Sequence, residues 1–137
     1  MGNGESILLV DDEPQILEVY REVFSQAGYA ALTAASAEEA LKVVQETPAW
    51  VFFLDLHLPG MNGLELCRRL HADCPKAICY AVTGYTSMFE MHECRDAGFQ
   101  DYFLKPVRRA ALLEAAALAF QKLERWAQAL PQSVWVA

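Results

Sequence analysis

Five polar side chains of this sequence stand directly after short apolar runs, where they could act together in one reaction. Three are the carboxylates of Asp11, Asp12 and Asp55, and the other two are the hydroxyl of Thr83 and the ammonium of Lys105. Carboxylates bind hard cations and can act as nucleophiles, whereas an ammonium and a hydroxyl stabilise negative charge. The set therefore indicates phosphoryl transfer to a carboxylate.

The three carboxylates predict a magnesium site if the strands that precede them are neighbours. Their repulsion would raise the pKa of at least one of them unless a cation lay between them. Mg²⁺ takes oxygen ligands, while zinc favours histidine and cysteine, so Mg²⁺ fits this set better. Asp55 is then the expected nucleophile, which would form an aspartyl phosphate. Lys105 and Thr83 would stabilise the charge on the transferred group.

An alternation of strand and helix patterns predicts the α/β scaffold that must position these residues. Strands are expected at 7–10, 29–34, 50–54, 77–82 and 101–104. Helices are expected from Pro14 to Gly28, from Ser36 to Pro48, and over 64–72, 87–97 and 108–129. Each of the five polar residues falls at the carboxyl end of a strand, where open parallel sheets bind their ligands.

Two of the expected helices carry specific predictions about how they begin and pack. Ser36 and Glu39 have the spacing of a capping box, in which each side chain bonds to the other residue's backbone. The helix over 87–97 is mostly polar, and Met88, Met91 and Cys94 form its only candidate apolar face. We therefore expect weak burial of that helix.

The composition favours a single compact domain without nucleic-acid binding. The chain has 137 residues, of which 54% are hydrophobic and 21% charged, and its formal net charge is -7. An acidic chain of this kind lacks the basic surface that nucleic-acid binding requires, so no direct nucleic-acid contact is expected. We find no bilayer-spanning apolar run and no secretory signal, which predicts a cytoplasmic protein without membrane insertion.

The four cysteines show no C-x-x-C pair. They are Cys67, Cys74, Cys79 and Cys94, and three of them lie in apolar or amphipathic runs. We expect reduced cysteines that pack as small hydrophobic residues. Disulfide pairing or zinc binding is the alternative.

Four sequence segments together resemble the receiver domain of response regulators, the phosphoacceptor module of two-component signalling. The segments are LLVDDEP at 8–14, LDLHLPGMNG at 54–63, VTG at 82–84 and DYFLKP at 101–106. The similarity spans 6–127, which we take as the receiver domain, and leaves 128–137 as a tail or linker remnant. The combination is specific for this family, although each segment alone would be weak evidence for it.

The resemblance implies a flavodoxin-like (βα)5 fold, a doubly wound parallel sheet with strand order 2-1-3-4-5. It makes Asp55 the phosphorylation site and places Asp12 and Asp55 as side-chain ligands of Mg²⁺. Asp11 would act largely through a coordinated water, and the backbone carbonyl of His57 would complete the protein ligands.

The resemblance also implies a switch. Thr83 and Lys105 match the family's phosphate-contacting hydroxyl and ammonium, and Tyr102 matches its switch aromatic. The surface made by the helix at 87–97, the strand at 101–104 and the last helix would change on phosphorylation. The peptide bond between Lys105 and Pro106 is expected to be cis.

Two further positions tune the lifetime of the phosphoryl group in the family, and here they hold His57 and Gly84. Gly84 would leave the pocket open to water. His57 could approach the phosphoryl group or face solvent, and we favour solvent.

The resemblance further implies the partners. The donor would be a sensor histidine kinase or a histidine phosphotransfer protein, with small acyl phosphates able to substitute. Output would pass to a downstream protein partner or to an output domain missing from this sequence, and the switch surface could form a homodimer. Beyond its own phosphorylation and autodephosphorylation, the domain would not be an enzyme. The tail residues Val134, Trp135 and Val136 could dock on the domain or be disordered.

Three other functions remain open at this stage. A flavin protein shares the fold, but an acidic loop after the first strand would repel the flavin phosphate. A phosphatase acting on a small substrate would usually need an acid two residues after the nucleophile, where His57 stands. A phosphorylation-independent interaction module would have an acidic pocket that does not bind Mg²⁺.

Overall fold

The structure, a computed structural model, describes residues 5–85 and 87–129. Its parallel sheet has the order β2-β1-β3-β4-β5, so the predicted order 2-1-3-4-5 is confirmed. The strands are β1 (Ser6–Val10), β2 (Ala30–Ala34), β3 (Val51–Leu54), β4 (Ile78–Thr83) and β5 (Asp101–Leu104). No strand bound differs from the predicted one by more than a single residue, which is within the usual uncertainty of an element's end.

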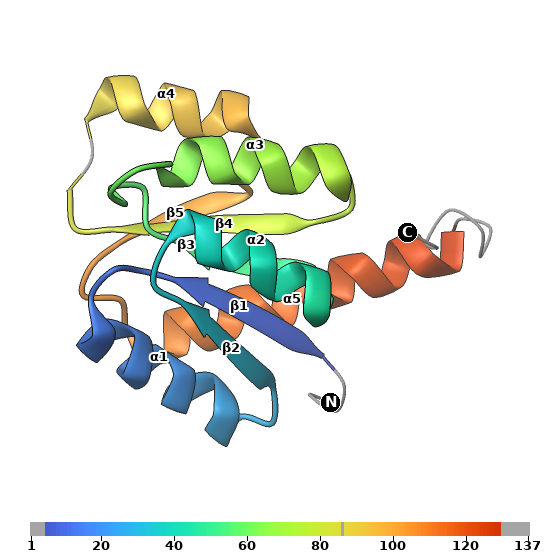
Figure 1. The fold of residues 1–137 in the computed structure, drawn as a ribbon. Coiled ribbons are helices and arrows are strands. Elements are labelled where there is room, and N and C mark those ends of the chain that lie inside the picture. The colour runs from blue at the N-terminus through green and yellow to red at the C-terminus, as the bar shows by residue number, and fades with distance from the viewer. Residues whose placement is uncertain (1–4, 86, 130–137) are drawn as a thin grey trace.

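Five helices connect and follow the strands, and they cover both faces of the sheet (Figure 1). They are α1 (Pro14–Gln26), α2 (Ala37–Glu46), α3 (Gly63–Asp73), α4 (Met88–Ala97) and α5 (Arg109–Ala129). Helices α1 and α5 lie on one face, and α3 and α4 lie on the other. This is the doubly wound arrangement that alternating strand and helix patterns predict. The tail residues Val134, Trp135 and Val136 lie outside the described residues.

Each face of the sheet has its own apolar core because successive residues of a strand point to opposite sides. In β1, Leu8 and Val10 pack toward α2, α3 and α4, whereas Ile7 and Leu9 pack toward α1 and α5. The central strands β1, β3 and β4 are buried on both sides, which explains their continuous apolar runs. The rigid sheet therefore fixes the residues at its carboxyl edge.

The predicted capping box at the start of α2 is only half formed. The Glu39 amide donates to the Ser36 hydroxyl at 3.1 Å, but the Glu39 carboxylate accepts from the Ala35 amide instead of the Ser36 amide. A complete capping box instead begins α4, where Ser87 and Glu90 bond reciprocally. The S-x-x-E pattern of Ser87 and Glu90 was present in the sequence and was missed.

The predicted apolar face of α4 is wrong in two of its three residues. Met88 is 77% exposed and Met91 is also exposed, whereas Cys94 and Ala97 are buried. The helix packs on α3 through its small side chains, so its long methionines point outward. The predicted weak burial of the helix is confirmed.

Within residues 5–85 and 87–129, no helix has both the length and the apolar composition to cross a bilayer.

A buried tyrosine makes the fold sensitive to alkaline pH. The Tyr80 hydroxyl on β4 donates to the Ala115 carbonyl on α5 at 2.9 Å, and burial raises the pKa of Tyr80 to about 12 from 10.0. The neutral phenol is thus favoured in the folded state, so this stabilisation is complete below pH 10 and is lost as the pH rises through 12.

We therefore expect the free energy of unfolding to fall by about 2 kcal/mol between pH 10 and 12 because of this one group. Urea titrations across this range should show a smaller fall in Tyr80→Phe, which lacks the titrating hydroxyl. Equal pH dependence in both proteins would contradict the assignment.

Candidate functional site

The carboxylates of Asp11 and Asp55 lie side by side because the register of β1 and β3 places them so. Val10 pairs with Leu54, and the Asp55 amide donates to the Val10 carbonyl at 2.9 Å. The following residues leave the sheet at the same edge, and both carboxylates are buried. Parallel strands thus gather the predicted acidic residues at one point.

The loop that holds Asp55 allows no side chain at position 63. A Cβ added to Gly63 would lie 2.2 Å from the Asp55 carbonyl oxygen. The Gly63 amide also donates to the Leu56 carbonyl at 3.1 Å, so the start of α3 packs directly on the backbone of the Asp55 loop. Gly63 is therefore a positioning residue for the site.

Lys105 joins the two buried carboxylates from the end of β5. Its ammonium lies 2.6 Å from Asp11 Oδ2 and 3.3 Å from Asp55 Oδ2, and it also contacts Glu13 at 3.3 Å. The peptide bond between Lys105 and Pro106 is cis, as expected. The lysine therefore places a positive charge beside both buried carboxylates.

The charges of the site shift one another's protonation. Burial raises the pKa of the Asp11 carboxyl, although the hydrogen bonds from Lys105 and from the Glu13 amide oppose the shift. Burial also disfavours the charge of Lys105, but the hydrogen bond to Asp11 and the charge of Asp55 together raise its pKa above the ordinary value. Lys105 therefore stays charged at neutral pH.

The oxygen atoms of the site fit a divalent cation. Carboxylate oxygens of Asp11, Asp12 and Asp55 lie within 4.8 Å of one another, and Asp12 is exposed. The Asp55 Oδ1 atom accepts from the His57 amide at 3.0 Å, which fixes the orientation of this carboxylate. An all-oxygen site with an open side suits Mg²⁺, which keeps several waters when bound.

Thr83 is buried at the end of β4, and its hydroxyl contacts His57 rather than a reacting atom. Its Oγ1 donates to the Tyr85 carbonyl at 2.9 Å and lies 3.1 Å from His57 Nδ1. The resting position of the hydroxyl is therefore set by Tyr85 and His57.

His57 connects this hydroxyl to α4. Its side chain is 44% exposed, which agrees with the expected solvent exposure, but both ring nitrogens have partners. Nε2 lies 2.8 Å from the Glu90 carboxylate, and Nδ1 faces Thr83. A carboxylate can only accept, so Nε2 carries a proton. The sequence offered no signal for this contact, which joins residues 33 positions apart.

Gly84 and Tyr102, the other two positions that the resemblance singled out, have different surroundings. An added Cβ at Gly84 would have no atom within 4 Å, so this side of the site is open. Tyr102 is half-buried on β5 and lines a cavity of about 440 Å³ beside α4.

Residues 7–117 of this chain match the family model described as "Response regulator receiver domain". Sporulation initiation phosphotransferase F of Bacillus subtilis (strain 168) is 31% identical over 103 residues, which cover 75% of this chain and 83% of that protein. The DNA-binding response regulator MtrA of Mycolicibacterium smegmatis is 33% identical over 109 residues, which cover 80% of this chain and 47% of that protein.

The solved structures agree with the sequence comparison. A receiver domain protein described as CheY-like, from Methanospirillum hungatei JF-1, has a TM-score of 0.85 at 31% identity, with 88% of this chain and 97% of that chain covered. Several curated relatives are longer than this chain. The matched region makes up 25% of the alginate biosynthesis transcriptional regulatory protein AlgB of Pseudomonas aeruginosa.

Proposed function

Because the chain belongs to the response regulator receiver family, we propose that it accepts a phosphoryl group on Asp55 and thereby changes a surface that a partner recognises. The observation that carries the proposal is the buried Asp55 carboxylate held between the His57 amide and the Lys105 ammonium. A nucleophile fixed on both sides can attack in one orientation only, which lowers the entropy cost of the reaction.

The donor in this proposal is a phosphohistidine on a sensor kinase or on a phosphotransfer protein. An Asp55 oxygen forms the new P–O bond while the P–N bond of the donor breaks. The leaving imidazole keeps the electron pair and takes a proton from water. Lys105, already 3.3 Å from Asp55 Oδ2, neutralises charge on the phosphoryl oxygens during the transfer.

Magnesium fits the same site. We propose that Asp11, Asp12, Asp55 and the His57 carbonyl hold it, with Asp11 acting largely through water. When bound, Mg²⁺ supplies the positive charge that offsets the carboxylates and the incoming phosphoryl oxygens. Lys105 would then be released from part of its contact with Asp11 and be free to face the phosphoryl group.

Asp12 offers a test of the metal site, because it is exposed and so can be changed with little effect on packing. Asp12→Asn should weaken Mg²⁺ binding by about tenfold or more, since it removes one charged oxygen ligand. Isothermal titration calorimetry measures this directly, and Glu22→Gln on the exposed side of α1 is the matched control. Unchanged affinity in Asp12→Asn would exclude Asp12 as a ligand.

The switch in this proposal begins at Thr83. The phosphoryl group would draw the Thr83 hydroxyl away from His57 and Tyr85, and the Tyr102 ring would turn toward the vacated space. His57 bonds to Glu90 in the capping box of α4. The loss of its contact with Thr83 would therefore change the hydrogen bonding at the start of that helix. Because most of α4 is exposed, a shift of this helix would require little free energy.

The surface that would change is formed by α4, β5 and α5, and large apolar side chains are exposed on each of these elements. They include Met88 and Phe89 on α4, Leu104 on β5 and Leu118 on α5. We propose that a downstream protein, an attached output domain or a second copy of this chain recognises this surface in the cytoplasm. Exposed apolar groups of this kind are common at recognition sites.

The contact between His57 and Thr83 predicts a measurable bias toward the unphosphorylated state. His57→Ala removes one hydrogen bond that holds Thr83, with a net value of about 1 kcal/mol. The acetyl phosphate concentration needed for half-maximal phosphorylation should therefore fall about fivefold. Intact mass spectrometry gives the phosphorylated fraction.

Two variants control this experiment. Glu90→Gln keeps an oxygen acceptor for His57 Nε2, so its effect should be smaller. His92→Ala removes an exposed histidine of α4 and should have no effect. A half-maximal concentration that is unchanged or higher in His57→Ala would contradict the proposed restraint on Thr83.

The experiment that tests the proposed function is incubation with acetyl phosphate, with and without Mg²⁺, followed by intact mass measurement. We expect one phosphoryl group per chain with Mg²⁺ and none after addition of EDTA. No phosphorylation from acetyl phosphate or from histidine-phosphorylated donors, together with no Mg²⁺ binding, would instead favour an interaction module that works without phosphate.

A further inference from the structure

We propose that Cys67, His71 and Cys79 form a second metal site, one that binds a thiophilic divalent cation such as zinc. The site lies between α3 and β4, on the sheet face covered by α2, α3 and α4. It shares no residue with the acidic site around Asp55.

Local structure brings the three ligands together. Cys67 and His71 stand four residues apart on α3 and so lie on one face of the helix. Cys79 lies on β4, where its side chain points into the same core as Cys67. One atom from each side chain lies within 4.8 Å of the other two.

The distance between the first two ligands already suits zinc. In tetrahedral sites the Zn–S and Zn–N bonds place a sulfur and a nitrogen about 3.5 Å apart. Cys67 Sγ and His71 Nδ1 are 3.5 Å apart in this structure. A small movement of the Cys79 side chain would place its sulfur at a third corner of the tetrahedron.

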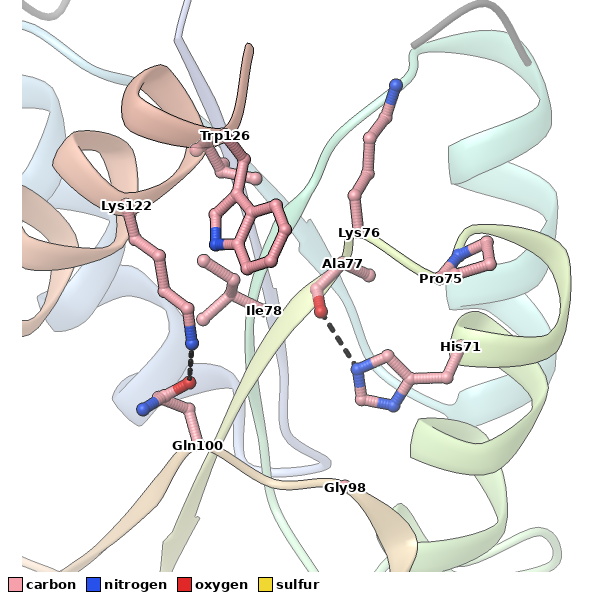
Figure 2. A pocket seen from close by; sticks show the side chains of 10 residues that line it. His71, Pro75, Lys76, Ala77, Ile78, Gly98, Gln100, Lys122 and Trp126 are labelled. Atoms are coloured by element: carbon pink, nitrogen blue, oxygen red, sulfur yellow. Dashed lines mark hydrogen bonds between the residues drawn. The ribbon is translucent and has the colours of Figure 1, made fainter. Parts of the chain in front are cut away.

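The orientation of the imidazole also fits a ligand. His71 Nε2 lies 2.8 Å from the Ala77 carbonyl (Figure 2), which can only accept, so Nε2 carries the proton. Nδ1 is then the nitrogen that faces Cys67. A backbone carbonyl on the far nitrogen is the usual way in which proteins orient a metal-binding histidine. The ring packs directly on Gly98, where an added Cβ would lie 2.9 Å from Nδ1.

The Cys67 sulfur lies close to both other ligands, 3.5 Å from His71 Nδ1 and within 4.8 Å of the Cys79 sulfur. A thiolate is the form that binds metal. The Cys67 sulfur also lies 3.4 Å from the Ala97 carbonyl, a weak contact that a thiolate would lose.

A route from solvent exists on the histidine side. Both sulfurs are fully buried, but His71 is half-buried and lines a cavity of about 530 Å³ with Gly98, Gln100 and Trp126 (Figure 2). An ion can reach Nδ1 when the ring turns, and a water from the cavity can fill the fourth position. The open fourth position is typical of three-ligand zinc sites.

Cobalt is the probe for this site, because a band from sulfur-to-cobalt charge transfer appears only when a thiolate binds the ion. The full chain is reduced with a phosphine and titrated with Co²⁺ in excess Mg²⁺, which occupies the acidic site. We expect the band to saturate at one equivalent and to be abolished by stoichiometric Zn²⁺. Absence of the band in folded protein would overturn the proposal.

Variants identify the ligands. Cys67→Ser and Cys79→Ser should abolish the band, and His71→Gln, at a half-buried position, should weaken Co²⁺ binding at least tenfold. Cys74→Ser and Cys94→Ser should keep it, because these cysteines are outside the three-residue cluster. Circular dichroism checks that each variant folds. A band that survives in Cys67→Ser, or that is lost in Cys74→Ser, would exclude the assigned ligand set.

Discussion

Replacement of Asp55 by asparagine should abolish phosphorylation, and this is the largest effect that we expect. An amide has no negatively charged oxygen to attack phosphorus, whereas the Asp55 carboxylate of the wild type is held between the His57 amide and Lys105. Asp55→Asn should therefore give no mass increase with acetyl phosphate and Mg²⁺ at any time.

A matched control separates this effect from a general loss of acidic charge. Asp73 is exposed at the end of α3, so Asp73→Asn changes the net charge by the same amount. We expect wild-type phosphorylation in Asp73→Asn. Phosphorylation of Asp55→Asn to the wild-type level would show that another residue is the acceptor.

Replacement of Gly63 by alanine should destabilise the fold and disable the site together. The new Cβ would lie 2.2 Å from the Asp55 carbonyl oxygen, a distance that only a shift of the backbone can relieve. We expect a loss of about 3 kcal/mol or more in the free energy of unfolding, at the upper end of the cost of overpacking. For a domain of this size the loss lowers Tm by roughly 10 °C.

Gly84 provides the control for this substitution, because an added Cβ there meets no atom within 4 Å. Gly84→Ala should change the free energy of unfolding by no more than about 0.5 kcal/mol. Thermal melts of both variants, followed by circular dichroism, give the comparison. A Gly63→Ala protein as stable as Gly84→Ala would contradict this prediction, because it would show that the Asp55 loop accommodates the added Cβ with no loss in the free energy of unfolding.

The scaffold was predictable because its signals are local. Apolar runs ending in Asp11, Asp55, Thr83 and Lys105 marked the strands and placed these residues at one edge of the sheet, where the structure gathers them. The order of the strands came from the family resemblance, since periodicity alone does not say which strands are neighbours.

The contacts that were missed depend on geometry between distant elements. No spacing rule connects His57 to Glu90, or Gly63 to the Asp55 carbonyl, because these contacts form only when loops pack. The outward position of Met88 was missed for a similar reason. Which side of a weakly amphipathic helix is buried is decided by the neighbour on which it packs, here α3.

The cysteines show another limit of prediction from the sequence alone. The expected burial is confirmed for Cys67, Cys79 and Cys94. The sequence contained the spacing of Cys67 and His71 on one helix face, but nothing in it indicated that Cys79 would lie opposite them. The pairing of a helix with a particular strand supplies that information.

The most direct test of the central claim is to locate the phosphoryl group. Borohydride reduces an aspartyl phosphate to homoserine with release of phosphate, so the modified residue is marked permanently. After treatment of the phosphorylated protein, peptide mass spectrometry should find homoserine at position 55 and aspartate at positions 11 and 12. Homoserine at another aspartate, or a phosphoryl group on His57, would contradict the account.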